Sequence, residues 1–290
     1  MSSQVGSQSK ESDIKLKHIL QIMQCQKCEN TAVYTRKYSG ESLCSECFSN
    51  SILRKAAKTI SKYKMIKNDE LVVVGVSGGK DSLVLLSILK KMSETHNFRI
   101  IAVTIDEGIP GYRDEALEIV KSFCSKLDVE FRTYSYKELY DVTLSESLEL
   151  RDEEKTTSCS ICGIFRRRAL DHAAEELGAN VIATGHNLDD SLQTFLINTL
   201  SGDSNKIGWM SPGSDSKQIR KIKPLAEIFQ ITPYSSEIFN GEIIFSEETR
   251  SDVCLGKGFS VKILNRILFE LDKIEGEFSN DIKKLILNIC

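Results

Sequence analysis

Residues 71–82 read LVVVGVSGGKDS, and the fold of the 290-residue chain can be worked out from this stretch. Its valine-rich half predicts a buried strand, and an apolar helical pattern from Leu83 to Met92 follows the two glycines at once. A tight turn of this kind gathers backbone N–H groups at the positive end of a helix, where they bind anions. Gly78 and Gly79 let a phosphate approach the backbone, and Lys80 adds a positive charge. The stretch therefore predicts a phosphate-binding turn.

This turn differs from a Walker-type loop, in which Ser or Thr directly follows the lysine. Here Asp81 separates Lys80 from Ser82, and the glycine spacing also differs. The stretch instead resembles the SGGxDS pyrophosphate loop of enzymes that cleave ATP between the α and β phosphates and adenylate a substrate. In that setting Ser77 and Ser82 supply hydroxyl donors, and Asp81 helps to hold a metal ion or caps the helix. A plain glycine turn without a ligand is the alternative.

Strands and helices alternate from the turn to about residue 200. Further strands are expected over 99–105, 129–135 and 180–184, and helices over 113–127, after residue 157 and up to Leu200. Such alternation is typical of a parallel sheet with helices on both faces. The fold class predicted is therefore α/β, with a doubly wound parallel sheet.

Polar residues follow two of the predicted strands, at the sheet edge where ligands bind in such folds. Asp106 ends the second strand, and the fourth strand runs into GHNLDD, residues 185–190. Asp106 is suited to bind adenosine or ribose, but a helix cap and turn would explain it equally well. In the same way, His186 is alternatively an ordinary loop histidine, and Asp189 and Asp190 alternatively favour the helix N-terminus electrostatically.

Four cysteines near the N-terminus have the spacing of structural zinc ligands. Cys25 and Cys28 form one CxxC pair, and Cys44 and Cys47 form a second after 15 intervening residues. Four thiolates suit tetrahedral zinc, and a segment this short has little core of its own. Because all four positions are filled, the zinc is expected to be structural and not catalytic. Coincidental cysteines in a small α/β segment are the alternative.

A further CxxC pair, Cys159 and Cys162, is expected at the N-terminus of a helix. The helix dipole lowers the pKa of thiols at that end, and arginines at 166–168 add positive charge that suits phosphate. Half of a zinc site, a redox pair and inert packing beside a solvated arginine face are the alternatives.

The composition is that of an ordinary soluble globular protein, and a formal net charge of −3 excludes a globally basic chain. Nucleic acid would have to meet local basic patches at 50–68 or 217–223, although a solvated helix face explains the first equally well. The polar N-terminus has no apolar signal segment, and no run approaches the length of a transmembrane helix. We expect a cytosolic protein without membrane contact, in which the nine cysteines serve as metal ligands or catalytic thiols.

Four motifs occur in one order along the chain: CxxC…CxxC, SGGKDS with DEGIPGYR, CSICGIFRR, and TGHNLDD followed by SGD. Together they closely resemble the tRNA 2-thiolation proteins of the PP-loop superfamily, in the group of two-thiouridine synthesis protein A and the cytosolic wobble-uridine thiolases. The resemblance covers roughly residues 20–230. It implies a PP-loop fold of the adenine nucleotide alpha hydrolase type with an N-terminal zinc ribbon. The implied activity is that of an ATP-dependent tRNA uridine 2-sulfurtransferase.

The resemblance also implies a catalytic cycle and its residues. Mg²⁺–ATP binds at the turn, the C2 oxygen of a uridine attacks the α-phosphate, and sulfur then displaces AMP to leave 2-thiouridine. Lys80 and Asp81 are expected to act in catalysis as well as in binding. The implied nucleotide-binding residues are Val76, Ser77, Gly78, Gly79, Lys80, Asp81, Ser82, Ile105, Asp106, Gly185 and Asp190.

Three cysteines beside the nucleotide complete the implied site. In this family they hold a 4Fe-4S cluster or, in an older view, carry persulfide sulfur, and here Cys159 and Cys162 match two of them. The third is expected to be Cys254, although Leu-Gly-Lys follows it where the family usually has Cys-Pro-Tyr. The C-terminal zinc finger that is common in the family also has no counterpart before Cys290. Cys124 has no matching role and is expected in the core.

The expected domains are a disordered tail (1–19), the zinc ribbon (20–52), the PP-loop ATP-binding catalytic domain (53–230) and a mixed helical segment carrying the third cysteine (231–290). The expected partners are tRNA, a second copy of the chain in a homodimer, and a sulfur donor, either sulfide or a ubiquitin-like sulfur-carrier protein. Two other functions are compatible with the turn. One is a PP-loop amidotransferase or ligase of the NAD or GMP synthetase type, which needs no paired cysteine sets. The other is a non-catalytic tRNA-binding module.

Overall fold

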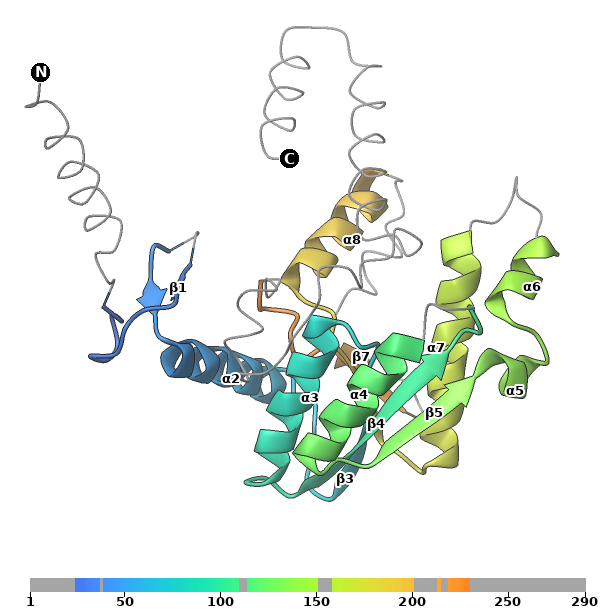
Figure 1. The fold of residues 1–290 in the computed structure, drawn as a ribbon, viewed down its shortest axis with the longest axis horizontal. Helices are drawn as coiled ribbons and strands as arrows, with labels where there is room; N and C mark the ends of the chain where they lie inside the picture. The colour runs from blue at the N-terminus through green and yellow to red at the C-terminus, as the bar shows by residue number, and fades with distance from the viewer. Residues whose placement is uncertain are drawn as a thin grey trace, which may run out of the picture. The chain divides into compact units, whose positions relative to one another are not determined.

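The computed structural model describes residues 24–36, 39–109, 114–150, 158–200, 213–214 and 219–229 (Figure 1). The chain divides into two compact units. The N-terminal unit contains the described residues up to Arg54, and the sheet unit contains those from Lys55 to Phe229. No helix among these described residues is long and apolar enough to cross a bilayer. The domain boundaries expected from the sequence stay predictions.

The N-terminal unit consists of a small antiparallel hairpin and the start of a helix. Strand β1 (Tyr34–Thr35) pairs with β2 (Ser42–Leu43), and Gln24 and Thr31 form an isolated bridge. Helix α2 (Ser45–Lys62) begins two residues after β2. The sequence predicted a helix from residue 50, so the helix begins five residues earlier and includes Cys47. The second cysteine pair therefore lies on a helical turn.

One sheet organises the other unit. Among the described residues its strand order is β5 (Phe131–Ser135), β4 (Phe98–Asp106), β3 (Glu70–Gly75), β6 (Val181–Thr184), β8 (Arg220–Ile222) and β7 (Gly213–Ser214). The first five are parallel, and only β7 pairs in the antiparallel sense. The chain moves outward from β3 to β5 and then returns to β6 on the other side of β3. The direction of winding thus reverses between β3 and β6, where such folds bind ligands.

Helices cover both faces of this sheet, as the handedness of parallel crossovers requires. Helices α3 (Lys80–Ser93) and α4 (Asp114–Leu127) contact each other on one face, and α7 (Ser158–Glu176) packs on the other. Figure 1 shows α3 and α4 in front of the strands and α7 behind them. Helix α8 (Leu188–Leu200) follows β6. The doubly wound α/β fold predicted from the sequence is confirmed.

The core lies on both faces of the central strand. All residues from Glu70 to Val74 in β3 are buried, which explains the unbroken run of valines, because both faces of a parallel sheet are covered. On the α7 face, Val73 and Ile101 meet the small side chains of Ala169 and Ala173. Cys124 on α4 is buried, as expected. Two short helices, α5 (Tyr136–Tyr140) and α6 (Leu144–Glu149), each begin with a capping box and connect β5 toward α7.

Besides the earlier start of α2, the predicted elements differ from the structure at strand β8. Strand β8 lies within the basic patch at 217–223, where the sequence predicted no strand. Its three residues are Arg-Lys-Ile, so it carries little apolar pattern, and its pairing with β6 decides its conformation. The mixed helical segment expected at 231–290 lies outside the described residues.

Candidate active site

The phosphate-binding turn lies at the carboxyl end of β3, next to the point where the winding reverses. Strand β4 binds both backbone groups of Val76. The Val76 N–H donates to the carbonyl of Val103 at 2.8 Å, and the Val76 carbonyl accepts from the Thr104 hydroxyl at 2.7 Å. The Ser82 hydroxyl donates to the carbonyl of Gly79 at 2.7 Å and accepts from the N–H of Ser77 at 3.2 Å. The turn is therefore pre-shaped by its own serines.

Glycine is required at one position of this turn by its backbone conformation. Gly78 has a φ of +82°, in the left-handed region, and a Cβ there would lie 3.0 Å from the Cβ of Ala116 on α4. Gly79 is the N-cap of α3 and has no side-chain capping bond. The first turn of the helix begins there with Lys80 and Asp81, whose Nζ and Oδ2 atoms lie 3.5 Å apart. Charged groups of both signs thus stand at the anion-binding end of the helix.

The loop after β6 approaches the same helix end closely. A Cβ at Gly185 would lie 3.0 Å from three backbone atoms of Asp81 and Ser82. Only glycine allows this approach, because the contacted atoms are backbone and cannot turn aside. The two glycine-containing loops predicted at 78–79 and 185 are therefore adjacent in space.

We expect Gly185→Ala to destabilise the sheet unit by about 1–3 kcal/mol, the usual cost of overpacking a rigid site. The added methyl group must push the loop after β6 away from the start of α3. Gly163→Ala is the matched control, because its Cβ would meet only the end of the Arg167 side chain at 3.4 Å, within a helix that alanine favours. Urea unfolding of both variants checks this. Equal stability of Gly185→Ala and the native protein would contradict the close approach.

Asp106 ends β4, His186 follows β6, and Asp190 lies in the first turn of α8, all at this edge of the sheet. Asp106 accepts a hydrogen bond from the N–H of Gly108 at 2.9 Å, so its carboxylate shapes the loop that follows. Asn187 and Asp190 cap α8 reciprocally, each side chain accepting from the other's backbone N–H at 3.0 and 2.9 Å. His186 contacts the Thr184 hydroxyl at 2.9 Å through Nδ1. Although His186 is exposed, partial desolvation by the surrounding atoms and the charge of Lys223 lower its pKa.

The second predicted group, the cysteines, is only partly described. Cys159 and Cys162 both lie in the first turns of α7, but nothing is described of the Cys159 side chain, and Cys254 lies outside the described residues. Cys162 is half-buried. Its carbonyl accepts from the Tyr136 hydroxyl at 3.0 Å, and its sulfur accepts from Nη2 of Arg166 at 3.2 Å.

A buried acid supports that arginine. Glu107 accepts from Arg166 at its Oε1 atom, at 3.0 Å from Nε and 2.7 Å from Nη2. Burial alone would lower the pKa of Arg166, but its interactions with Glu107, Cys162 and Tyr136 together outweigh burial and raise it. Burial also raises the pKa of Tyr136, so its hydroxyl stays protonated as a donor. Sequence reasoning did not select Glu107, whose only sequence signal is a carboxylate directly after a strand expected to be buried.

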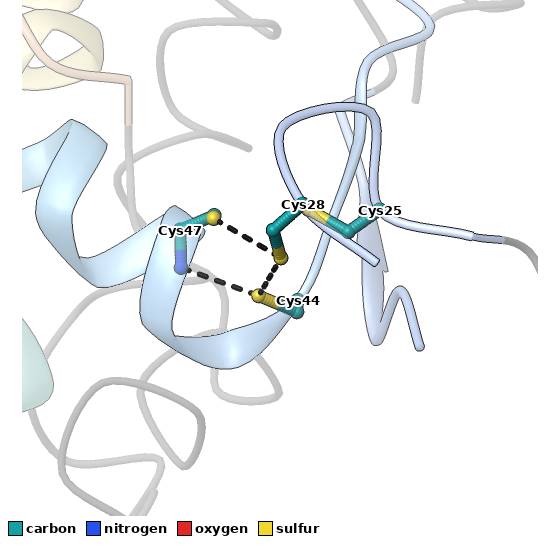
Figure 2. Close-up of side chains that lie close together, drawn as sticks. All are labelled: Cys25, Cys28, Cys44 and Cys47. Atoms are coloured by element: carbon teal, nitrogen blue, oxygen red, sulfur yellow. Dashed lines mark hydrogen bonds between the residues drawn. The ribbon is translucent and has the colours of Figure 1, made fainter. Parts of the chain in front are cut away.

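The four N-terminal cysteines come together in the N-terminal unit. Their sulfur atoms all lie within 4.8 Å of one another, with 3.5 Å between Cys28 and Cys44 and 3.6 Å between Cys28 and Cys47 (Figure 2). A zinc ion with four Zn–S bonds of about 2.3 Å places its sulfurs about 3.8 Å apart, so the spacing and the donor set fit. No disulfide joins the described cysteines.

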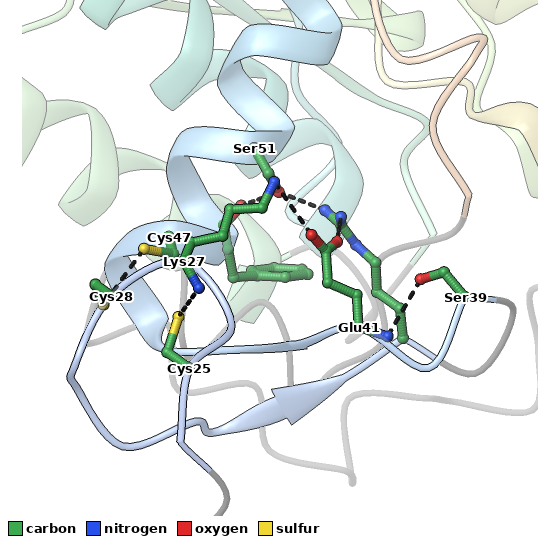
Figure 3. A network of polar contacts seen from close by, with 9 residues as sticks. Cys25, Lys27, Cys28, Ser39, Glu41, Cys47 and Ser51 are labelled. Carbon is green, nitrogen blue, oxygen red and sulfur yellow. Dashed lines mark hydrogen bonds and ion pairs between the residues drawn. The ribbon is translucent and has the colours of Figure 1, made fainter.

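Backbone groups and one carboxylate hold this cysteine cluster together. The N–H groups of Lys27 and Cys47 donate to the sulfurs of Cys25 and Cys44, both at 3.4 Å. Burial raises the pKa of Cys25, but backbone N–H donors outweigh it and lower the pKa to about 6. Glu41 accepts from Lys27 at 3.1 Å and from Arg36, whose other nitrogen donates to Ser51 on α2 (Figure 3). The first cysteine loop, the hairpin and the helix are thus joined at Glu41.

Comparisons with known proteins match two domain families along the chain. Residues 49–232 match the PP-loop domain, and residues 24–49 match the N-terminal LIM domain of 2-thiouridine synthetase TtuA. The chain is 37% identical over 231 residues to cytoplasmic tRNA 2-thiolation protein 1 of Drosophila sechellia, which covers 76% of this chain and 67% of that protein. The protein of the same name from Lodderomyces elongisporus is 37% identical over 252 residues, or 78% of this chain and 66% of that one. The chain thus spans about two thirds of the length of the curated relatives it matches.

A solved structure is similar over a larger share. The U34-tRNA thiolase NcsA from Methanococcus maripaludis, solved with its [4Fe-4S] cluster, matches with a TM-score of 0.69 and 28% identity. The match covers 92% of this chain and 87% of that one. The recognition made from the four ordered motifs is confirmed: the chain belongs to the PP-loop domain family and, within it, to the family of cytoplasmic tRNA 2-thiolation protein 1.

Proposed function

We propose that the protein is an ATP-dependent tRNA uridine 2-sulfurtransferase that acts in the cytoplasm, as its relatives' name indicates. The observation that supports the proposal is the close approach of Gly185 to the start of α3, because it brings two glycine-containing loops together where the winding of the sheet reverses and such folds bind ligands. The similar protein NcsA is a thiolase of U34 in tRNA, and we assign the same uridine as substrate here.

The residues of the turn are suited to adenylation of the uridine. Backbone N–H groups at the start of α3 and the Lys80 ammonium group bind and neutralise the pyrophosphate portion of ATP. The uridine C2 oxygen attacks the α-phosphorus, the bond to the bridging oxygen breaks, and pyrophosphate leaves. Asp81 is placed to hold the Mg²⁺ ion that accompanies ATP. Sulfur then replaces the adenylated oxygen, and AMP departs with it.

Cys159, Cys162 and Cys254 are the proposed ligands of a 4Fe-4S cluster. The thiolate donor set fits, since Cys162 is half-buried beside a cation and iron–sulfur clusters are held by cysteine thiolates. Bound there, a cluster held by three protein thiolates would supply a site for the incoming sulfur. The protein's part would be to hold the thiolates of Cys159 and Cys162 in the first turns of α7 while the nucleotide occupies the strand ends.

A structural zinc ion in the N-terminal unit, bound by Cys25, Cys28, Cys44 and Cys47, is the second metal proposed. Its support is the mutual spacing of four sulfurs within 4.8 Å. We also propose a homodimer, and sulfide or a ubiquitin-like sulfur-carrier protein as the donor of sulfur. These last assignments depend on the family resemblance.

The absorbance of anaerobically reconstituted protein tests the cluster. We expect a broad brown absorbance that is lost in Cys162→Ala, because a missing thiolate removes one of three protein ligands. Cys124→Ala is the matched control, since Cys124 is buried in α4 and takes no part in the site. Its spectrum should equal that of the native protein. Loss of the colour in both variants, or retention in both, would contradict the assignment of Cys162.

A further inference from the structure

Glu107 is a buried carboxylate at the carboxyl end of β4, and its side chain contacts α7, the helix that carries Cys162. It follows Asp106 directly at the end of β4, and its side chain is 1% exposed. Its carbonyl accepts from the N–H of Leu144 at 2.8 Å, which fixes the backbone at this point. A buried carboxylate is costly unless it is paired, and the partner here is Arg166, 59 residues further along the chain.

Arg166 connects Glu107 to Cys162. Its Nη2 atom lies 2.7 Å from Oε1 of Glu107 and 3.2 Å from the sulfur of Cys162, so one guanidinium group contacts both. The Arg166 side chain is 43% exposed, so packing alone does not restrain it. Its two contacts with Glu107, through Nε and Nη2, restrain it instead. The Tyr136 hydroxyl fixes the backbone of the same turn through the Cys162 carbonyl. Helix α7 thus orients the Cys162 sulfur toward the Arg166 guanidinium group, which Glu107 holds in place.

We propose that Glu107 is a positioning residue that holds the Arg166 guanidinium against the sulfur of Cys162 and thereby sets the charge beside the sulfur-delivering centre. This inference rests on the proposed function, in which Cys162 is a cluster ligand. Hydrogen bonds to the sulfurs around a cluster and the net charge nearby tune its reduction potential. Arg166 would therefore act on the cluster through the Cys162 sulfur, and Glu107 would act through Arg166. The position of Glu107 next to Asp106 ties this arrangement to the strand end that is expected to bind nucleotide.

A second buried ion pair in the same sheet, Arg220 with Glu70, lies far from the proposed site and serves as a comparison for a purely structural role. Arg220 donates to Glu70, which lies at the opposite end of β3 from the phosphate-binding turn, and the Lys67 N–H donates to Glu70 at 2.7 Å. Glu70 is buried, like Glu107. Glu70→Gln is therefore a matched control for the loss of one buried carboxylate.

The test compares Glu107→Gln, Arg166→Met, the double variant and Glu70→Gln in the full-length, anaerobically reconstituted protein. The readouts are kcat and the KM for ATP in tRNA thiolation, the midpoint potential of the cluster, and the unfolding midpoint. We expect Glu107→Gln to lower kcat by about 10- to 100-fold, as loss of an outer-shell partner of a metal ligand does. The KM for ATP should stay unchanged, because the phosphate-binding turn is intact.

The sign of the change in potential distinguishes positioning from simple charge. If Glu107 positions Arg166, the Arg166–sulfur contact is lost in Glu107→Gln, so the potential falls as it does in Arg166→Met, and the double variant falls no further. A rise in Glu107→Gln would mean that Arg166 stays in place and only a negative charge has gone, and would overturn the proposal. Changes equal to those of Glu70→Gln, limited to the unfolding midpoint, would overturn it as well.

Failure of the proposed function itself is visible in the native protein alone. A native protein that forms no 2-thiouridine contradicts the proposed function, and this inference with it. A native protein that thiolates tRNA without iron contradicts only the cluster, and the comparison of kcat and KM still decides the role of Glu107.

Discussion

Lys80→Ala is expected to lower the rate of 2-thiouridine formation by about 100- to 1,000-fold, the usual cost of removing one preorganised group that stabilises transition-state charge. Lys80 is the first residue of α3, at the helix end that the phosphate-binding turn presents to an anion. In the proposed reaction, negative charge builds on the leaving pyrophosphate as the uridine is adenylated, and we propose that the Lys80 ammonium group offsets this charge. Binding of tRNA should survive, because the fold and the basic surface elsewhere are unchanged.

The measurement is single-turnover formation of 2-thiouridine and AMP, followed by mass spectrometry of tRNA nucleosides. Lys90→Ala is the matched control, because Lys90 lies in the last turn of the same helix and pairs with Glu94 at 3.6 Å. It should react at the native rate. If Lys80→Ala thiolates tRNA as fast as Lys90→Ala, the turn does not activate ATP in the way described.

The second large effect is expected in the N-terminal unit when its metal is removed. Structural zinc contributes an apparent free energy on the order of 10 kcal/mol to the folding of small thiolate domains, which exceeds what a hairpin and a helix end can supply. The hairpin is held by few backbone bonds of its own, such as Val33 N–H to the Leu43 carbonyl at 2.9 Å. A strong chelator, or Cys44→Ser, should therefore unfold this unit.

Hydrogen exchange resolved by mass spectrometry checks this expectation residue range by residue range. Amides of residues 24–54 should lose protection after chelation, while those of β3 and β4 keep it. Cys124→Ser is the control for loss of a thiol, and it should retain one zinc per chain. Protection of 24–54 that persists in metal-free protein would show that the four cysteines do not depend on a metal for their arrangement.

Much of the fold followed from the sequence because its signals are local. The run of valines in β3, the abrupt glycines and the periodic leucines of α3 each constrain a few neighbouring residues, and the strand–helix alternation then fixes a parallel sheet. Strand β8 was not predicted, because two of its three residues are basic and give no strand pattern. Its conformation depends on pairing with β6, which lies more than 30 residues earlier in the chain. The start of α2 at Ser45 was not predicted, because the spacing of Cys44 and Cys47 does not show the periodicity of a helix.

The candidate site divides in the same way. The phosphate-binding turn and the four N-terminal cysteines are motifs of fixed spacing, and they are legible in the sequence. The approach of Gly185 to Ser82, and the contact of Glu107 with Arg166, join residues that are about 100 and 59 positions apart, which no local pattern reports. For Asp106 the sequence left two roles open. The structure shows the turn contact with the Gly108 N–H, and the role in nucleotide binding stays a prediction.

The stoichiometry of a single turnover tests the central claim most directly. Native protein, reconstituted anaerobically, would be mixed with ATP, sulfide and unmodified tRNA, and the nucleotides and nucleosides would be quantified together. The account predicts one AMP and one pyrophosphate for each 2-thiouridine formed, because the uridine oxygen leaves on the α-phosphate. Release of ADP and phosphate, or 2-thiouridine formed without ATP cleavage, would contradict it.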